Sequence, residues 1–331
     1  MNHHRIFAIA AVAAVAAGTV PAAAEDAVLR ISHQLPPAHH IAKLVDSWAA
    51  DIESRTGGSV DVQIFGANQA FGARENFEAV ATGQIEAALS VNFQWAGSVP
   101  AMNVTVVPYL FTDLERIKAF PGSEAAGYLD SLLDEVGVRN IAWLYTTRQS
   151  IFTSKGRALV DVGDFEGVKI RGLNRIADAG LAAAGAATVA MSGSEVYQAL
   201  QTGVIDAGLT DVSAAYSRKY YEVQDHGTVA PFFSVYFHIY VNPDWFDGLT
   251  DAQRDAIAAA SAKAEADAIT VTEATAEAAI AELQKVGMTL HMQTEAEKAA
   301  WEAVMVQPVT DAFVEAAGPA GQRIVELLGQ L

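Results

Sequence analysis

The sequence predicts an α/β protein of two lobes spanned by one long helix. One phrase occurs twice, FEAVATGQIEAAL at 77–89 and YQALQTGVIDAGL at 197–209, with six of thirteen positions identical. Each copy indicates a helix with an apolar face, a glycine that can end it in the left-handed conformation, and a short apolar strand. Two such units favour two lobes of similar plan, although alanine-rich helices ending in glycine also recur by chance. In addition, residues 250–285 contain no proline or glycine, which predicts the long helix.

Residues 1–24 have the features of a cleaved export signal. Arg5 supplies a positive charge, 6–20 is a run of apolar and small residues, and the alanines at 22–24 match a small-residue cleavage site. The run is shorter than the ~20 residues that a membrane-spanning helix needs. We therefore expect export with cleavage after Ala24 rather than a membrane anchor.

The composition of the mature chain limits the classes of protein to which it can belong. Cleavage after residue 24 would leave 307 of the 331 residues, a length that fits two domains. Twenty basic residues remain against 39 acidic ones, a net charge of −19. Such a chain repels nucleic acid and anionic membrane surfaces. Cysteine is absent, so a large core rather than disulfides must stabilise the fold.

The first lobe should comprise mainly residues 25–140. Strands are expected at 28–32, 60–65 and 87–91, because each is a short apolar or alternating run. The helix after the first strand has apolar residues at helical spacing, namely Ile41, Leu44, Val45, Trp48 and Ile52. Strand and helix alternate, which predicts a largely parallel sheet with helices on its faces.

The second lobe should comprise mainly residues 141–235, where the same alternation restarts. Its expected strands are 141–145, 150–154 and 168–171. A helix over 174–185 ends on a glycine. Ser192 and Glu195 have the spacing of a capping box, which predicts the start of the helix in the second repeat.

The third segment, 236–331, should hold a crossing strand, the long helix and C-terminal helices. At 1.5 Å per residue the long helix extends about 54 Å, more than the diameter of a small domain. A coiled-coil partner helix is the alternative, but the apolar positions are mostly alanine, which is too small for a sustained seam. We therefore expect the helix to span both lobes as a strut.

One segment of this acidic chain is locally cationic. Residues 148–175 contain six basic residues and only three acids, which suggests an anion site, with scattered solvated charges as the alternative. Arg171 ends an apolar strand, and ligands of open α/β sheets bind outside the carboxyl ends of strands. Its guanidinium can pair two N–H groups with both oxygens of a carboxylate. Arg171 is therefore the candidate anion clamp, and an ion pair within its own lobe is the alternative.

Further polar and aromatic residues follow predicted strands. Asn92 and Trp95 come after the strand of the first repeat; the amide could bind ligand hydroxyls, and the indole could form an apolar wall or belong to the core. His33 and Gln34 end the first strand and could make polar contacts with a ligand. Phe232, which follows a proline, could close a cleft from the other lobe.

Three histidines raise the question of a metal or catalytic site. Catalytic zinc needs three well-placed ligands, and the adjacent His39 and His40 diverge if the prolines at 36–37 keep the chain extended. We expect no metal and no cofactor. A lyase-like enzyme that uses His33 with Glu75 is an alternative, although no Gly-x-Ser-x-Gly, Gly-rich phosphate loop or Cys–His arrangement is present.

Several motifs together resemble one family over essentially the whole mature chain. They include SHQLPPAHHIAKLVDSWAADIESRTGGSVDVQIF, VVPYLF and, most specifically, GVKIR followed by SEVYQALQTGVIDA. The chain thereby resembles the solute-binding proteins of tripartite ATP-independent periplasmic (TRAP) transporters, DctP type. The resemblance implies a two-lobed periplasmic binding protein fold with crossing strands and a spanning helix. It also implies a periplasmic receptor that closes on a solute, docks on a membrane permease and catalyses no reaction. Because two lobes joined by crossing strands can hinge about a few residues, we expect a monomer that closes on its ligand.

The resemblance also implies site residues. Arg171 matches the arginine that clamps the solute carboxylate, Arg148 matches a second ligand-facing arginine, and Asn174 matches a solute-contacting position. Two departures leave the identity of the solute open: Gly193 stands where some members place an aromatic residue, and Thr210 stands where others have asparagine.

The solute class stays open in the sequence. A C4-dicarboxylate, a sugar acid, a hydroxy or keto acid and a sulfonate all fit one or two arginines with amides. A carboxylate bound together with a calcium ion, as in some TRAP receptors, is a further alternative.

Overall fold

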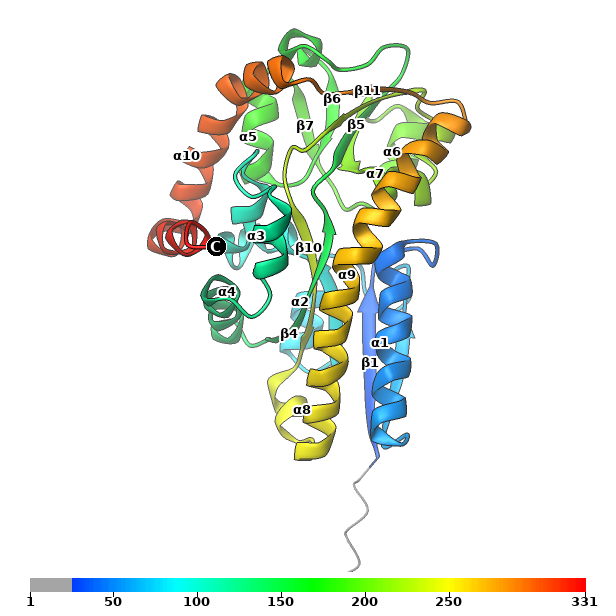
Figure 1. Ribbon diagram of the computed structural model, residues 1–331, viewed down its shortest axis with the longest axis vertical. Helices are drawn as coiled ribbons and strands as arrows, with labels where there is room; N and C mark the ends of the chain where they lie inside the picture. Colours follow the sequence, from blue (N-terminus) through cyan, green and yellow to red (C-terminus); the bar gives the residue numbers. More distant parts are fainter. Residues whose placement is uncertain (1–25) are drawn as a thin grey trace, which may run out of the picture.

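The computed structural model describes residues 26–331 and contains two β-sheets, one in each lobe (Figure 1). The expected export signal lies outside the described residues. The sheet of lobe 1 has the order β2 (Val60–Phe65), β1 (Ala27–His33), β3 (Ala87–Val91), β10 (Val235–Val241) and β4 (Arg139–Thr147). The sheet of lobe 2 has the order β11 (Thr289–Met292), β9 (His226–Ala230), β5 (Ser150–Ser154), β8 (Ala207–Asp211), β6 (Lys169–Gly172) and β7 (Ala187–Ala190). The two-lobed α/β architecture is confirmed.

Both sheets are mixed, whereas the sequence predicted largely parallel sheets. Of the nine strand pairings, four are antiparallel. The reason in lobe 1 is β10, which returns from lobe 2 and therefore runs opposite to both of its neighbours, β3 and β4. Local alternation of strand and helix does not reveal a strand that comes from the other lobe.

The chain crosses between the lobes at 148–149, between β4 and β5, and again at 231–234, between β9 and β10. Strand β4 pairs with β10 in the first sheet, so lobe 1 extends to Thr147 rather than to residue 140. The expected crossing strand is β10. Short connections of this kind can act as hinges between two lobes.

The two copies of the repeated phrase form the same element in different lobes. Helix α2 (Asn76–Ala81) leads into β3, and helix α6 (Val196–Thr202) leads into β8. Gly83 and Gly203 close these helices with φ angles of 71° and 72°, a left-handed conformation that glycine adopts at low cost. The prediction of two lobes of similar plan is confirmed.

The long helix is α9 (Asp251–Lys285), which contains 35 residues. It packs along α1 (His40–Thr56) and β4 in lobe 1 and against α7 (Val212–Ser217) in lobe 2 (Figure 1). Several of its buried residues are alanines, and such small side chains allow neighbouring elements to approach closely. The strut predicted from the sequence is therefore present.

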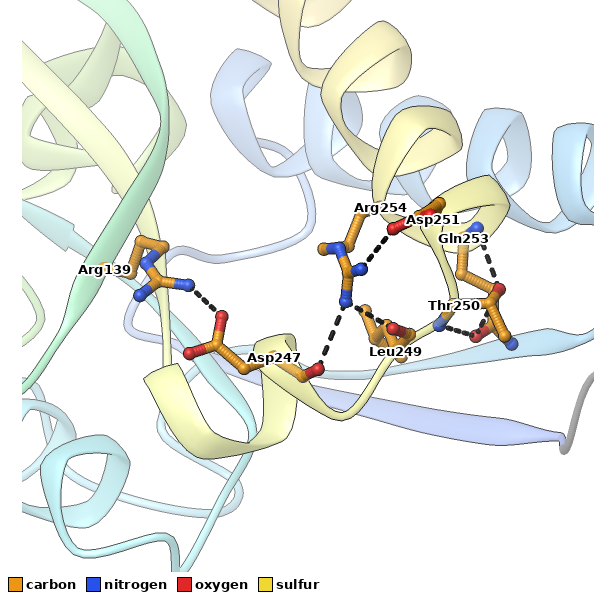
Figure 2. Close-up of polar contacts among 7 residues, drawn as sticks. All are labelled: Arg139, Asp247, Leu249, Thr250, Asp251, Gln253 and Arg254. Carbon is orange, nitrogen blue, oxygen red and sulfur yellow. Dashed lines mark hydrogen bonds and ion pairs between the residues drawn. The ribbon is translucent and has the colours of Figure 1, made fainter.

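Polar contacts fix the start of α9 (Figure 2). Thr250 Oγ1 accepts the Gln253 N–H at 3.3 Å, and Gln253 Oε1 accepts the Thr250 N–H at 2.9 Å, which forms a capping box. Arg254 donates to the backbone oxygen of Asp247 at 3.1 Å. The carboxylate of Asp247 pairs with Arg139 at the beginning of β4. The first turn of α9 is thus tied to the edge of the lobe 1 sheet.

The last helix, α10 (Glu295–Leu328), crosses the outer side of the molecule (Figure 1). It packs on α5 (Arg175–Ala183), η2 (Pro100–Val106) and α4 (Glu124–Glu135). It bends at Gly318, where φ is 53°, just before Pro319. The remaining helices are η1 (Asn92–Gly97), α3 (Leu114–Ala119), η3 (Val162–Phe165), η4 (Tyr220–Glu222) and α8 (Pro243–Asp247). None of the helices within 26–331 combines the length and apolarity needed to cross a membrane.

A carboxyl group beneath β4 should make stability depend on pH. Asp130 of α4 accepts the indole N–H of Trp143 at 3.0 Å. Burial raises the pKa of Asp130 to about 7, and the nearby Glu265 carboxylate adds to the rise. An unfolded aspartate has a pKa of about 3.9. The folded chain therefore keeps a proton that the unfolded chain has released, and this group lowers stability as pH rises from about 4 to about 7.

We expect Asp130→Asn to remove this part of the pH dependence and to raise stability at pH 8 by about 1–3 kcal/mol. Asparagine keeps an acceptor for Trp143 but cannot ionise. Urea unfolding at pH 5 and pH 8 measures the effect, with the exposed Glu135→Gln on the same helix as control. An equal fall in stability from pH 5 to pH 8 in the parent and Asp130→Asn would contradict this interpretation.

Candidate functional site

A small cavity of about 30 Å³ lies where the two lobes meet. Among the residues that line it are Gln34, Phe93 and Phe237 from lobe 1 and Arg171, Thr210 and Arg218 from lobe 2. Beside it, Asn68 Nδ2 of lobe 1 donates to Ser194 Oγ of lobe 2 at 3.2 Å, and Arg74 Nη2 donates to the Ala190 oxygen at 3.1 Å. The lobes are therefore closed against each other around the cavity.

Arg171 lies on β6 and is only 3% exposed. Its Nε and Nη2 both donate to the Met191 oxygen, at 3.3 and 3.2 Å, and Nη1 donates to the Leu209 oxygen. A guanidinium has five N–H groups, so two are left for another acceptor. No carboxylate within residues 26–331 forms an ion pair with Arg171.

Arg171 stays charged despite its burial. Burial lowers its pKa to about 10, and the nearby Arg218 guanidinium also lowers it. The ring of Phe93 lies 5.9 Å from Arg171 Cζ, which adds a cation–π contact. A buried cation without an anionic partner is costly unless a ligand supplies the negative charge.

Two other predicted residues, Gln34 and Thr210, also reach the cavity. Gln34 follows β1 and Thr210 lies on β8, and both are buried. Gln34 Oε1 has no hydrogen-bond partner in the described part of the chain. The cavity thus offers an amide and a hydroxyl next to the unpaired Arg171, an arrangement suited to a small polar anion.

Arg218, which was not among the residues predicted from the sequence, lines the same cavity. It directly follows α7, outside the cationic window at 148–175. The available signal was Gly193, which stands where some members of the family place an aromatic residue. The guanidinium of Arg218 lies over this glycine, because a Cβ at 193 would be 2.7 Å from Arg218 Cζ.

Arg148, predicted to face the ligand, does not line the cavity. It forms an ion pair with Glu273 on α9, with Nη2 and Oε2 2.8 Å apart. Tyr145 also donates its hydroxyl to Glu273, at 2.7 Å. Arg148 therefore holds the first crossing segment against the long helix, and its partner lies 125 positions away in the sequence.

Asn92 and Trp95, predicted as ligand contacts in lobe 1, are bonded within lobe 1. The Asn92 amide donates to the Met102 oxygen at 2.9 Å and to Thr105 Oγ1 at 2.8 Å. Trp95 donates its indole N–H to His238 Nε2 at 2.6 Å and is buried. These contacts hold both side chains within lobe 1, and neither residue lines the small interlobe cavity. Trp95 does border a larger hollow that also lies between the lobes.

Phe232 also belongs to the core rather than to the cavity. Its ring packs against Phe152 and Trp301, with centroids 5.2 and 6.0 Å apart. The next residue, Phe233, lines the cavity instead. Neighbouring side chains of an extended segment point in opposite directions, which accounts for the different places of the two rings.

Asn174 connects the lobes beside the cavity. Its Oδ1 accepts the Ile176 N–H at 2.9 Å and so caps α5. Its Nδ2 donates to the Phe93 oxygen and to Asn103 Oδ1, each at 2.7 Å. Asn174 also borders an adjoining hollow of about 370 Å³ between the lobes. The side chain therefore joins the start of a lobe 2 helix to lobe 1.

His33 and Glu75 are each engaged with their own loop. His33 Nδ1 accepts the Leu35 N–H at 3.2 Å, and burial lowers the pKa of His33. Glu75 accepts the Gly72 N–H at 2.7 Å, just as Glu195 accepts the Ser192 N–H at 2.7 Å in the second repeat. The two glutamates are thus corresponding helix-start residues, and neither glutamate lines the cavity.

His39 and His40 stack on each other with ring centroids 4.7 Å apart. His40 contacts Ser213 Oγ at 3.3 Å and Thr272 Oγ1 at 3.1 Å, and burial lowers the pKa of both histidines. Over residues 26–331, no group of three or more His, Cys, Asp and Glu side chains has the arrangement of a metal site.

Comparison with known proteins gives a consistent result. The family model described as "Bacterial extracellular solute-binding protein, family 7" (DctP) matches residues 31–316. The C4-dicarboxylate-binding periplasmic protein DctP of Rhodobacter capsulatus is 31% identical over 304 residues, which cover 91% of this chain and 90% of that protein. The 2,3-diketo-L-gulonate-binding periplasmic protein YiaO of Escherichia coli is 26% identical, covering 63% of this chain and 64% of that protein.

Solved structures share the fold. A TRAP periplasmic solute-binding protein from Desulfovibrio salexigens with bound orotic acid has a TM-score of 0.86 at 23% identity, covering 92% of this chain and 97% of that chain. One from Sulfurospirillum deleyianum with bound succinate has a TM-score of 0.85 at 20% identity, covering 92% and 99%. With the family model matching most of the sequence, the chain belongs to the bacterial extracellular solute-binding proteins of family 7, the DctP family.

Proposed function

We propose that this protein is the periplasmic solute receptor of a TRAP transporter, which binds a small organic acid between its lobes and delivers it to a membrane permease. The observation that carries the proposal is the state of Arg171, which is buried in the interlobe cavity. Two of its N–H groups have no acceptor in the described chain, and no acid there is paired with it. A carboxylate would supply both the missing charge and the acceptors.

The relatives support a carboxylate as the recognised group. The Rhodobacter capsulatus relative is named for C4-dicarboxylates and the Escherichia coli relative for a diketo sugar acid. The structural neighbours hold orotic acid and succinate. These ligands differ in size and in their other groups but share a carboxyl group, which matches the role proposed for Arg171.

The titratable groups of the cavity favour binding over catalysis. They are Arg171, Arg218 and Asp211, and an arginine is a poor general acid or base because its pKa is so high. The Asp211 carboxylate already accepts the Ala214 N–H at 2.7 Å and the Ser213 hydroxyl. A lyase would need an acid–base group aimed at the substrate.

The receptor should be monomeric and exported, with cleavage after Ala24. N-terminal sequencing of protein from the periplasm tests the cleavage, and light scattering tests the monomer. The two short crossings at 148–149 and 231–234 would serve as hinges when the lobes open for the solute, while the helix α9 makes a further connection between the lobes.

Thermal shift against a library of small organic acids tests the function. A bound acid at 100 times its Kd stabilises the folded state by about 2.7 kcal/mol, which raises the Tm by several degrees. Nuclear magnetic resonance of the mixture should show the acid unchanged after prolonged incubation. Consumption of the acid would instead indicate an enzyme, and no shift with any acid would contradict the receptor function.

A further inference from the structure

The strongest unexplained feature of the cavity is its second arginine. Arg218 follows the short helix α7, which Asp211 caps by accepting the Ala214 N–H at 2.7 Å. The next residue, Lys219, has a left-handed φ of 60° and is exposed. The chain therefore turns sharply, so that Lys219 reaches solvent while Arg218 lines the cavity.

Gly193 makes the space that Arg218 occupies. A Cβ at this position would lie 2.7 Å from Arg218 Cζ and 2.8 Å from Nη2, distances at which one of the two groups would have to move. Gly193 does not have a positive φ, so its backbone conformation does not require glycine. The absence of a side chain at 193 is thus explained by the room that the guanidinium needs.

The two guanidiniums flank one short segment of lobe 2. Arg171 donates twice to the oxygen of Met191, and Arg218 covers Gly193, two residues further on. Their proximity is also evident in the pKa of Arg171, which burial lowers and the charge of Arg218 lowers further. Two like charges are therefore held close together where the lobes meet.

Arg218 has no anionic partner within 26–331 and forms no ion pair there. Its Nε is buried without a hydrogen-bond acceptor. Asp211 is the one carboxylate lining the cavity in the described chain, and it is held by Ser213 and Ala214 at the start of α7. The neighbour of Arg218 is the neutral hydroxyl of Tyr220. Two cations thus face the solute space, and no carboxylate of the described chain is paired with either of them.

We propose that Arg218, seated over Gly193, binds a second acidic group of the solute, so that the receptor selects compact dianions over monoanions. The inference rests on the proposed function and extends it, with one carboxylate on Arg171 and the other on Arg218. A monoanion would satisfy one guanidinium and leave the other, the fully buried Arg171 or the half-buried Arg218 with its buried Nε, without a charged acceptor, which is costly.

Isosteric pairs of acids test the proposal by calorimetry. The probes are malonate, succinate and glutarate, each compared with its own monoamide, which keeps the shape but loses one charge. The parent protein should bind the best diacid at least about 30-fold more tightly than its monoamide, the loss typical when one partner of a buried charge pair is removed. A ratio below about threefold for every diacid that binds would overturn the proposal while leaving the receptor function intact.

Two variants test whether Arg218 causes the preference for diacids over their monoamides. In Arg218→Gln the affinity for the diacid should fall to within about threefold of the affinity for its monoamide. The monoamide should bind as it does to the parent protein, because only the second acidic group loses its partner. Gly193→Ala should also lower the ratio, since it displaces the guanidinium without removing it. The controls are Lys219→Gln, which removes the exposed neighbouring charge, and Gly127→Ala, where an added Cβ meets no atom within 4 Å. Both controls should keep the parent ratio.

The remaining outcomes are equally decisive. In one of them, Arg218→Gln loses affinity for the diacid and for the monoamide by the same factor while the Tm of the ligand-free protein stays unchanged. That result would show that Arg218 does not recognise the second acidic group of the solute. If Arg218→Gln does not fold, an unchanged ratio in folded Gly193→Ala would overturn the proposal. Failure of every acid to bind the parent protein would refute the proposed function itself, and this inference with it.

Discussion

Arg171→Ala should weaken binding of the acid identified by the thermal-shift screen about 30- to several-thousand-fold, which corresponds to about 2–5 kcal/mol. The side chain is buried in the interlobe cavity, and two of its N–H groups have no acceptor in the described chain. Removing it would shut a carboxylate into a closed cavity without its partner. Calorimetry of the parent and the variant measures the loss.

The same substitution should also destabilise the ligand-free protein to some extent. Arg171 donates to the backbone oxygens of Met191 and Leu209, and an unsatisfied buried acceptor costs about 1–3 kcal/mol. A lower Tm is therefore compatible with the clamp, and affinity has to decide. Arg171→Lys is the informative second variant, because it keeps the charge but cannot offer two parallel N–H groups.

The exposed Arg323→Ala on α10 is a suitable control, since its side chain pairs only with Glu326 at 3.5 Å on the same helix. It should leave solute affinity unchanged. If Arg171→Ala binds the solute within about threefold of the parent, a difference well under 1 kcal/mol, the carboxylate clamp is excluded.

The elements that the sequence predicted best are those set by local pattern. The alternating run at 60–65 and the apolar run at 87–91 are strands with these bounds, and the long helix begins one residue after Thr250. What local pattern could not predict is strand direction. The antiparallel course of β10 depends on a chain that leaves lobe 1 after Thr147, at the end of β4, and returns at Val235, at the start of β10.

The candidate site shows the same contrast between what local sequence pattern predicts and what only the fold reveals. Arg171, Thr210 and Gln34 reach the cavity because each lies at or near the end of a strand, where the topology places ligands. Arg148 was assigned to the ligand because its partner Glu273 on α9 could not be recognised without the fold. Arg218 was missed because a single arginine after a short helix has no pattern of its own.

A second large effect is expected at Trp301, which anchors the start of α10 on lobe 2. Its side chain is completely buried. The ring packs edge-on against Phe152 and Phe165, with centroids 4.9 and 5.1 Å apart. The indole N–H donates to the Val160 oxygen at 2.8 Å. One residue thus closes an aromatic cluster and satisfies a backbone acceptor at the same time.

Trp301→Ala should lower the free energy of unfolding by about 3–5 kcal/mol, because it removes a large buried side chain and leaves a cavity. Trp301→Phe should cost less, about 1–2 kcal/mol, since it keeps most of the ring contact and loses mainly the hydrogen bond to Val160. Urea unfolding monitored by circular dichroism gives both values. Val314→Ala, at an exposed position of the same helix, should change stability by about 0.5 kcal/mol or less. A loss below about 1 kcal/mol in Trp301→Ala would mean that α10 is not held on lobe 2 by this cluster, because no rearrangement of the remaining rings could fill so large a space at so little cost.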